Sequence, residues 1–329
     1  MQSTINKNML SKTQYYLELE EQYSAHNYHP LPVVLNRGDG VYVWDVDDKR
    51  YYDFLSGYSA INQGHRHPKV LKAFIEQAQR LCLTSRAFHS DALGEFAKFI
   101  TNYFGYDKVL PMNTGVEAVE TAIKLCRKWA YEVKGVEKNK ATIIVCDGNF
   151  HGRTTGVISF SSDTLANKNF GPYLPGFIII PYNDIAALEK ALQDKNVAGF
   201  LVEPIQGEAG VVIPDDGYLA KAKQLCKASN VLFLADEIQT GLCRTGRMLA
   251  CDHENVRPDV LILGKALGGG MLPVSAVLCD DEIMLTIKPG EHGSTYGGNP
   301  LACKTAITAL QVLKEEMMAE NAIVTGEAL

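Results

Sequence analysis

Five short apolar runs alternate with helical segments through the chain, and this pattern most constrains the fold. The runs lie at 143–146, 177–180, 200–202, 231–234 and 260–263, and the helical segments at 115–131, 184–193, 217–229 and 299–316. Runs without polar residues are typical of strands buried on both faces of a sheet. The alternation therefore predicts an α/β domain with a mostly parallel sheet, and 329 residues leave room for a smaller second domain.

The N-terminal part of the chain follows a different pattern. Ser11 predicts the start of a helix that runs to about Tyr23. The aromatic segments 41–46 and 51–54 flank a short polar turn and predict a β-hairpin. Pro68 opens an amphipathic helix, and another helix is expected at 91–104.

Composition narrows the class of partner. The net charge is −6, with 46% hydrophobic and 21% charged residues, which argues against nucleic acid or an anionic membrane. The eight cysteines form no C-x-x-C pair, so we expect reduced thiols and no metal site. No apolar stretch reaches membrane-spanning length, and residues 1–12 lack both arginine and the apolar core of a signal peptide. We expect a cytoplasmic protein, with the mitochondrial matrix as the alternative.

Lys265 is the first candidate for a chemical role. It follows the apolar run 260–263 through Gly264 and precedes a glycine-rich stretch. A primary amine at the end of a buried strand loses hydration, which lowers its pKa and makes the neutral amine accessible for attack on a carbonyl. Taken alone, Lys265 is better explained as a lysine that extends its amine to solvent from a strand end.

Asp236 is the second candidate, because it follows the run 231–234 and a buried carboxylate needs a cationic partner. A protonated pyridine nitrogen would serve, and Gln239 could reach the same ligand. The alternative for Asp236 is an ordinary capped turn. Since ligands of α/β sheets lie beyond the carboxyl ends of the strands, Lys265 on the neighbouring run favours the functional interpretation.

Two glycine-containing turns could hold a phosphate. Gly115 and Val116 lie in the motif Thr-Gly-Val-Glu-Ala that opens the helix at 115–131, where backbone N–H groups and the helix dipole favour an anion. Thr295 lies in the hydroxyl-rich turn 293–300. A simple threonine cap and an ordinary loop are the respective alternatives.

Other candidates have weaker individual signals. Phe150 could stack on a flat ring or belong to the core, and Arg153 could pair with a substrate carboxylate or with a surface acid. Glu208 could cover a cation or be solvated. On composition alone, packing is the expected role of Tyr28 and Tyr58.

The ordered set of motifs resembles the pyridoxal-phosphate aminotransferases that include ornithine, acetylornithine and γ-aminobutyrate aminotransferases. The motifs are Thr-Gly-x-Glu-Ala, Phe-His-Gly-Arg, Glu-Pro, Asp-Glu-x-Gln, Gly-Lys and Ser-Thr-Tyr-Gly-Gly-Asn-Pro, and they extend over nearly the whole chain. Within this family the segments 26–30, 62–65, 205–210 and 289–300 look like those of the ornithine aminotransferases. His151 departs from the pattern, because an aromatic or small residue is commoner there.

This resemblance implies the aminotransferase fold of type I, with a seven-stranded, mostly parallel sheet sandwiched by helices. The implied division is an N-terminal segment 1–60, a large cofactor-binding domain 61–300, and a helix at 301–329 that leads into a small domain. The family extends well past Leu329, so we expect a truncated small domain and impaired turnover. The resemblance also implies a homodimer with active sites at the subunit interface.

The resemblance also assigns roles around pyridoxal 5′-phosphate. Lys265 would attach the cofactor and then carry the proton, while Asp236 would keep the pyridine nitrogen protonated. Gln239 would bond the ring hydroxyl and Phe150 would stack on the ring. The implied phosphate ligands are Gly115, Val116 and, in the neighbouring subunit, Thr295.

The implied reaction transfers the δ-amino group of ornithine to 2-oxoglutarate, giving glutamate-5-semialdehyde and glutamate. Tyr28 and Arg153 would receive the α-amino and α-carboxylate groups of ornithine, with Tyr58 nearby. Glu208 would screen an arginine that otherwise binds 2-oxoglutarate. Another ω-aminotransferase, acting on acetylornithine or γ-aminobutyrate, and a non-catalytic chain with the same fold remain alternatives.

Overall fold

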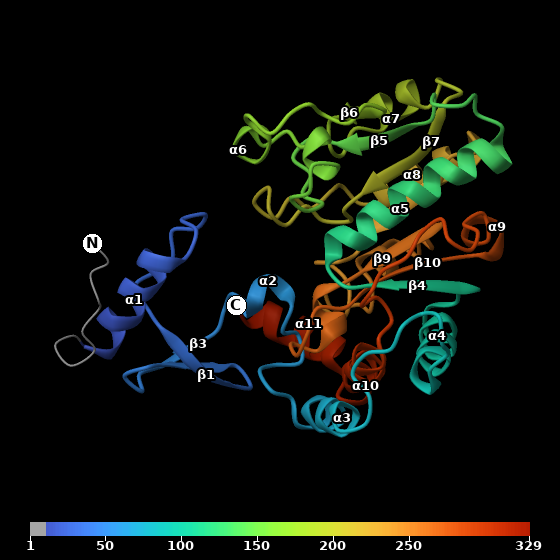
Figure 1. The fold of residues 1–329 in the computed structure, drawn as a ribbon. Coiled ribbons are helices and arrows are strands. Elements are labelled where there is room, and N and C mark those ends of the chain that lie inside the picture. Colours follow the sequence, from blue (N-terminus) through green and yellow to red (C-terminus); the bar gives the residue numbers. More distant parts are fainter. Residues whose placement is uncertain (1–10) are drawn as a thin grey trace.

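A seven-stranded sheet forms the centre of the protein. The computed structural model describes residues 11–329, and Figure 1 shows the sheet between helices. In spatial order its strands are β4 (Lys108–Met112), β10 (Ser275–Cys279), β9 (Val260–Leu263), β8 (Leu232–Asp236), β7 (Val197–Val202), β5 (Thr142–Cys146) and β6 (Phe177–Ile180). Strands β9, β8, β7, β5 and β6 are parallel, whereas β10 is antiparallel to both of its neighbours. The expectation of a mostly parallel sheet is confirmed.

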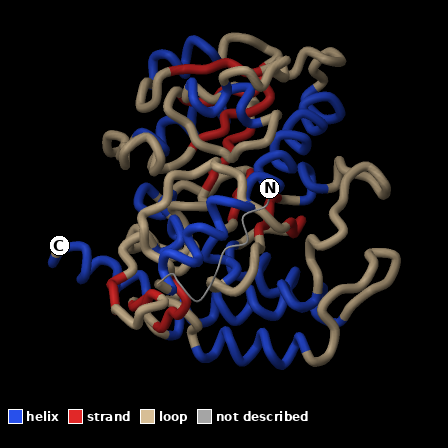
Figure 2. Tube along the Cα trace, turned by 60° about the vertical axis from the view of Figure 1, so that its left-hand side comes forward, coloured by secondary structure: helices blue, strands red, loops and turns tan. Residues whose placement is uncertain are grey.

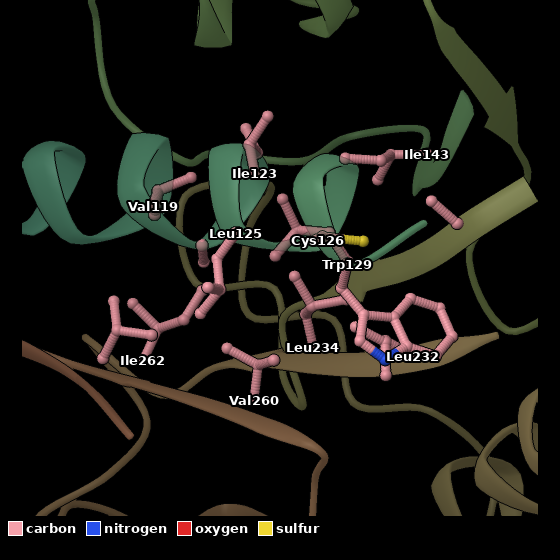
Figure 3. Packing of buried hydrophobic residues seen from close by; sticks show 14 of the residues in the cluster. Val119, Ile123, Leu125, Cys126, Trp129, Ile143, Leu232, Leu234, Val260 and Ile262 are labelled. Carbon is pink, nitrogen blue, oxygen red and sulfur yellow. The ribbon is translucent and has the colours of Figure 1, made fainter. Parts of the chain in front are cut away.

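One face of the sheet is covered by the helix α5 (Gly115–Trp129). Figure 3 shows its side chains Val119 and Ile123 above the sheet residues Ile262 and Leu234. Because side chains alternate along a strand, the residues between these positions point to the opposite face. Strands β5, β7, β8 and β9 are thus buried on both faces, which explains why their apolar runs contain no polar residue. The edge strand β6 differs, because its Ile179 is exposed.

The opposite face is covered in two parts. Around β5, β7 and β8 the covering helices are α7 (Ile185–Ala191) and α8 (Tyr218–Ala228). Around β9 and β10 they are α4 (Asp91–Phe104) and α10 (Pro300–Glu315). Against α10 lies α3 (Pro68–Ala78), and the chain continues into α11 (Met318–Ala328).

The N-terminal segment forms a separate small sheet. Its strands are β1 (Leu35–Asp39), β2 (Tyr42–Asp45) and β3 (Arg50–Tyr52), paired in that order and antiparallel. The expected hairpin is therefore β2 and β3, and β1 is an additional strand. Helix α1 (Lys12–Tyr23) begins as predicted, because the Ser11 side chain accepts a hydrogen bond from the Gln14 N–H. Figures 1 and 2 both show the small sheet apart from the large one.

The remaining helices are short. They are α2 (Ser56–Ser59), α6 (Thr164–Asn167) and α9 (Asp281–Met284). Within residues 11–329, no helix combines the length and the apolar character needed to cross a bilayer.

Candidate active site

The carboxyl ends of the parallel strands surround a cavity of about 250 Å³. Its lining residues come from the loops after β4, β5, β7, β8 and β9, and they are Gly115, Val116, Phe150, His151, Gly152, Glu203, Ile205, Asp236, Ile238, Gln239, Thr240 and Lys265. Six of the residues predicted from the sequence, Gly115, Val116, Phe150, Asp236, Gln239 and Lys265, therefore meet in one place. Cavities at this edge of an α/β sheet are where ligands bind.

Lys265 has an unusual backbone conformation. Its φ is +44°, a left-handed conformation that is uncommon for a residue with a side chain. The preceding Gly264 packs closely against Ile238, since a Cβ atom there would lie 3.2 Å from Ile238 Cγ2. Burial lowers the pKa of the Lys265 amine, although the negative charges of Asp236, Glu208 and Glu203 partly oppose this shift. The neutral amine is thus accessible nearer to neutral pH than in a solvated lysine.

Asp236 is the last residue of β8 and is almost fully buried. Its Oδ2 atom lies 2.7 Å from His151 Nδ1, and its Oδ1 atom accepts the Ile238 N–H at 3.1 Å. Burial alone would lower the pKa of His151, but its hydrogen bond to Asp236 and the charge of that carboxylate raise it. The pair therefore joins a carboxylate to an imidazole, and both residues line the cavity. His151 Nε2 has no hydrogen-bond partner in the described part of the chain.

Glu203 is a buried residue of the site that sequence reasoning did not assign. It follows β7 directly, and its Oε2 atom accepts the Phe150 N–H at 2.9 Å. Burial raises the pKa of Glu203 to about 7, with His151 opposing and Asp236 adding to the shift. The signal that could have found it is the one that identified Asp236: a carboxylate directly after a purely apolar run.

The first turn of α5 closes one end of the cavity. Thr114 and Glu117 form a capping box, in which the Thr114 side chain accepts the Glu117 N–H and the Glu117 carboxylate accepts the Thr114 N–H. The amides of Gly115 and Val116 have no intrahelical acceptor, because the first turn of a helix lacks one. They can therefore bind an anion such as a phosphate.

Glycine at two positions allows the walls of the cavity to meet. A Cβ atom at Gly152, whose φ is +122°, would lie 2.5 Å from Val116 Cγ2. A Cβ atom at Gly115 would lie 3.1 Å from Ile238 Cδ1. The first turn of α5 and the loop that carries Phe150 are thus in direct contact.

These features fit pyridoxal phosphate. The cavity presents an amine for the aldehyde carbon at Lys265, a carboxylate for the ring nitrogen at Asp236 and an aromatic wall at Phe150. Free helix amides for the phosphate stand at the start of α5. No group of three or more His, Cys, Asp or Glu side chains in the described part of the chain is arranged to hold a metal ion.

Two further predicted residues lie at the edge of this cavity. Glu208 is exposed and accepts a hydrogen bond from Gln239 Nε2 at 3.1 Å. The guanidinium carbon of Arg153 lies 5.4 Å from the centre of the Phe150 ring, within the range of a cation–π contact. Both side chains are therefore attached to cavity residues without lining the cavity.

The structure does not bring the other three predicted residues to the cavity. Tyr28 is 68% exposed and lines a separate hollow beside α1. Tyr58 is 57% exposed on α2, and Thr295 is exposed in the loop before α10. A single chain therefore buries none of these three side chains.

The chain is similar in sequence and fold to known aminotransferases. Residues 23–329 match the family described as Aminotransferase class-III. The mitochondrial ornithine aminotransferase of Rattus norvegicus is 63% identical over 317 residues, which cover 96% of this chain and 72% of that protein. An ornithine aminotransferase of Plasmodium falciparum is 59% identical, with coverage of 95% and 76%.

Solved structures agree. The ornithine aminotransferase of Toxoplasma gondii ME49 superposes with a TM-score of 0.96 at 51% identity, covering 98% of this chain and 76% of that chain. The acetylornithine aminotransferase of Elizabethkingia anophelis has a TM-score of 0.88 at 57% identity, with coverage of 97% and 77%. The resemblance drawn from the motifs is confirmed, and the sheet is that of the fold-type I aminotransferases. The chain belongs to the class-III aminotransferase family, whose members use pyridoxal phosphate.

Proposed function

We propose that this chain is an ornithine δ-aminotransferase that uses pyridoxal phosphate to transfer the δ-amino group of ornithine to 2-oxoglutarate. The observation that carries the proposal is the convergence of Lys265, Asp236 and the free amides of α5 on one cavity. The identity of 63% to an ornithine aminotransferase supports the choice of substrate. The products would be glutamate-5-semialdehyde and glutamate.

Bound pyridoxal phosphate supplies an electron-withdrawing ring that stabilises negative charge on the substrate carbon that loses a proton. Lys265 accepts that proton and returns it to the neighbouring atom. Its lowered pKa suits this role, because an acid–base group works best when its pKa lies near the working pH. The constrained turn at Lys265 holds the amine over the cavity.

Asp236 and His151 set the charge at the far end of the ring. The Asp236 carboxylate would face the ring nitrogen and keep it protonated, while its hydrogen bond to His151 holds it in place. Gln239 would bond the ring hydroxyl, and Phe150 would stack on the ring. Glu203 holds the Phe150 backbone in place through its 2.9 Å hydrogen bond.

Arg153 and Glu208 would form the substrate side of the site. Arg153 is exposed beside Phe150, where its guanidinium can pair with the α-carboxylate of ornithine. Glu208 is anchored to Gln239 and would screen an arginine that otherwise binds 2-oxoglutarate. Tyr28 and Tyr58 would contact the amino-acid end of ornithine.

We further propose a homodimer with active sites at the subunit interface. The exposure of Tyr28, Tyr58 and Thr295 outside the cavity of their own chain supports this arrangement. Thr295 would then reach the cofactor phosphate of the neighbouring subunit. The proposed division is a segment 1–60, a cofactor-binding domain 61–300 and a helical part of a small domain at 301–329.

The compartment is proposed on sequence grounds. Composition and reduced cysteines support the cytoplasm. The relatives from rat and Drosophila melanogaster that are described as mitochondrial support the matrix as the alternative. Fractionation of cells that express the natural gene would distinguish the two compartments.

The experiment is a substrate panel on the protein loaded with pyridoxal phosphate. We expect ornithine with 2-oxoglutarate to produce the semialdehyde, which is detected with o-aminobenzaldehyde, and borohydride reduction to label Lys265. Faster turnover of acetylornithine would favour the second candidate, which the 57% identity to an acetylornithine aminotransferase supports. Cofactor binding without turnover of any panel substrate would instead indicate a non-catalytic chain.

A further inference from the structure

The loop that carries Thr295 is attached to α5 through the imidazole ring of His292. His292 Nε2 lies 2.8 Å from Thr121 Oγ1, and His292 Nδ1 lies 2.9 Å from Lys124 Nζ. Thr121 and Lys124 are neighbours on one face of α5, because residues three apart on a helix lie side by side. Both ring nitrogens of His292 are therefore bonded to the same helix.

These contacts determine which nitrogen carries the proton. An ammonium group has only donors, so His292 Nδ1 must present its lone pair to Lys124. The proton then resides on Nε2 and is donated to Thr121 Oγ1. The Thr121 hydroxyl donates in turn to the Glu117 carbonyl at 2.7 Å. In this series of hydrogen bonds from Lys124 to Glu117, each of the three bonds has a donor and an acceptor only when the imidazole is neutral and in this tautomer.

We infer that His292 is a positioning residue, whose neutral Nε2–H imidazole holds the Thr295 loop against α5. The inference rests on the proposed function in one respect, namely that Thr295 serves the cofactor phosphate of the neighbouring subunit. The same helix α5 lines the cavity of its own chain with Gly115 and Val116. One helix would thus position a phosphate ligand set for each of the two sites.

The loop has other contacts, both at the surface and with the residues before α5. Glu291 and Lys128 form an ion pair of 2.9 Å at the surface, and such pairs contribute little. Ser294 accepts from Asn113 Nδ2 at 2.9 Å and from the Gly297 N–H at 3.0 Å. Thr121 is fully buried, so water does not easily replace its bond to His292.

Protonation of His292 would break this arrangement. A proton on Nδ1 removes the acceptor of Lys124 and brings two cations into contact. Burial and the charge of Lys124 accordingly lower the pKa of His292. Lys128 from α5 is paired with Glu291 of the loop at 2.9 Å, so its charge is balanced there. The attachment should therefore hold at neutral pH and weaken in acid.

The first experiment reads the imidazole directly by ¹⁵N NMR of the histidine-labelled protein. We expect His292 to show an unprotonated Nδ1, and its pKa to rise in Lys124→Met but not in Lys128→Met. The Lys128 variant is a matched control, because it removes an ion pair between the same helix and loop without contact to the ring. A proton on Nδ1 at neutral pH, or equal pKa values in all three proteins, would overturn the inference.

The second experiment measures how fast pyridoxal phosphate leaves the loaded protein after dilution. His292→Phe should accelerate release about tenfold, as expected for the loss of one buried hydrogen bond of about 1.4 kcal/mol. His292→Gln should restore part of the retention, because its amide can donate to Thr121. Unchanged release in His292→Phe would overturn the positioning role. Unchanged release in Thr295→Ala would instead contradict the proposed role of Thr295, so the two failures are distinguishable.

Discussion

His151 Nδ1 lies 2.7 Å from Asp236 Oδ2, and only 5% and 4% of these two residues is exposed. Moving two hydrated ions into a buried pair costs free energy. Removing one partner costs more, because the other charge is then left buried and unpaired. The pair therefore adds little net stability, while it holds a carboxylate where a ring nitrogen would bind. Asp236 satisfies only Nδ1 of the ring, because His151 Nε2 has no partner in the described part of the chain.

Replacing Asp236 with Asn should damage both stability and chemistry. His151 would be left as a buried cation or lose its proton, so the free energy of unfolding should fall by about 3 kcal/mol. Turnover should fall at least about a hundredfold, because the ring nitrogen would no longer be held protonated. Urea denaturation and the rate of semialdehyde formation measure the two effects.

A matched control is Asp280→Asn. Asp280 pairs with Arg257 at 2.7 Å, but both side chains are 40% or more exposed. The expected loss is at most about 1 kcal/mol with unchanged turnover. If both variants lost the same stability, burial would not be the cause of the Asp236 effect.

The raised pKa of Glu203 should make the stability of the protein depend on pH. Its folded pKa of about 7 lies above the ordinary 4.5, so between these values the unfolded chain has released the proton and the folded chain has not. Stability should therefore fall as pH rises from about 4.5 to 7, by an amount on the order of 3 kcal/mol. Glu203→Gln should lack this slope in urea denaturation across that range, and an identical slope in both proteins would refute the assignment.

His151 acts in the same direction over a neighbouring range. Its folded pKa is raised, so its contribution to stability is complete below its ordinary pKa of 6.5 and is lost as pH rises through the folded value. Asp236 is the partner responsible, so the His151-dependent slope should disappear in the Asp236→Asn variant. Comparison of the two single variants with the double variant Glu203→Gln, Asp236→Asn separates the contributions.

Lys265→Ala should abolish turnover while the fold remains intact. Loss of the proton-carrying amine should lower the rate by at least about a thousandfold. Borohydride should then leave the protein unlabelled. Stability should not fall, because the variant removes a partly buried amine whose pKa is lowered by that burial. Labelling of a different lysine with retained turnover would contradict the proposed mechanism.

The sequence predicted the five parallel strands because each contains a run without polar residues. Four of them are buried on both faces, whereas the edge strand β6 exposes Ile179. The same pattern of apolar runs did not lead to a prediction of strands β4 and β10. Strand β4 contains Pro111, which usually argues against a strand, but β4 lies at the edge of the sheet where a missing N–H donor is tolerated. Strand β10 follows directly on a glycine-rich turn, so its apolar run was not separated from the loop.

The site was predictable to the extent that it lies at strand ends. Asp236, Lys265 and Phe150 follow apolar runs, and the topology of a parallel sheet brings such positions together. The surroundings of Tyr28 and Tyr58 were not predictable, because they depend on how the N-terminal segment packs. Nor does a residue pattern reveal that His151 turns toward Asp236 rather than into the core.

The glycine at 152 gives a test of how the cofactor cavity is built. Its φ of +122° and the 2.5 Å approach to Val116 leave no room for a side chain. Gly152→Ala should cost about 2 kcal/mol of stability and displace the first turn of α5, which would weaken the binding of pyridoxal phosphate. Gly94→Ala in α4 is the control, because a methyl group there meets no atom within 4 Å and should stabilise the protein by about 0.5 kcal/mol. Cofactor affinity measured by fluorescence should therefore fall only in the Gly152 variant. Equal affinities in the two variants would show that the contact between Gly152 and Val116 does not determine the position of the α5 amides.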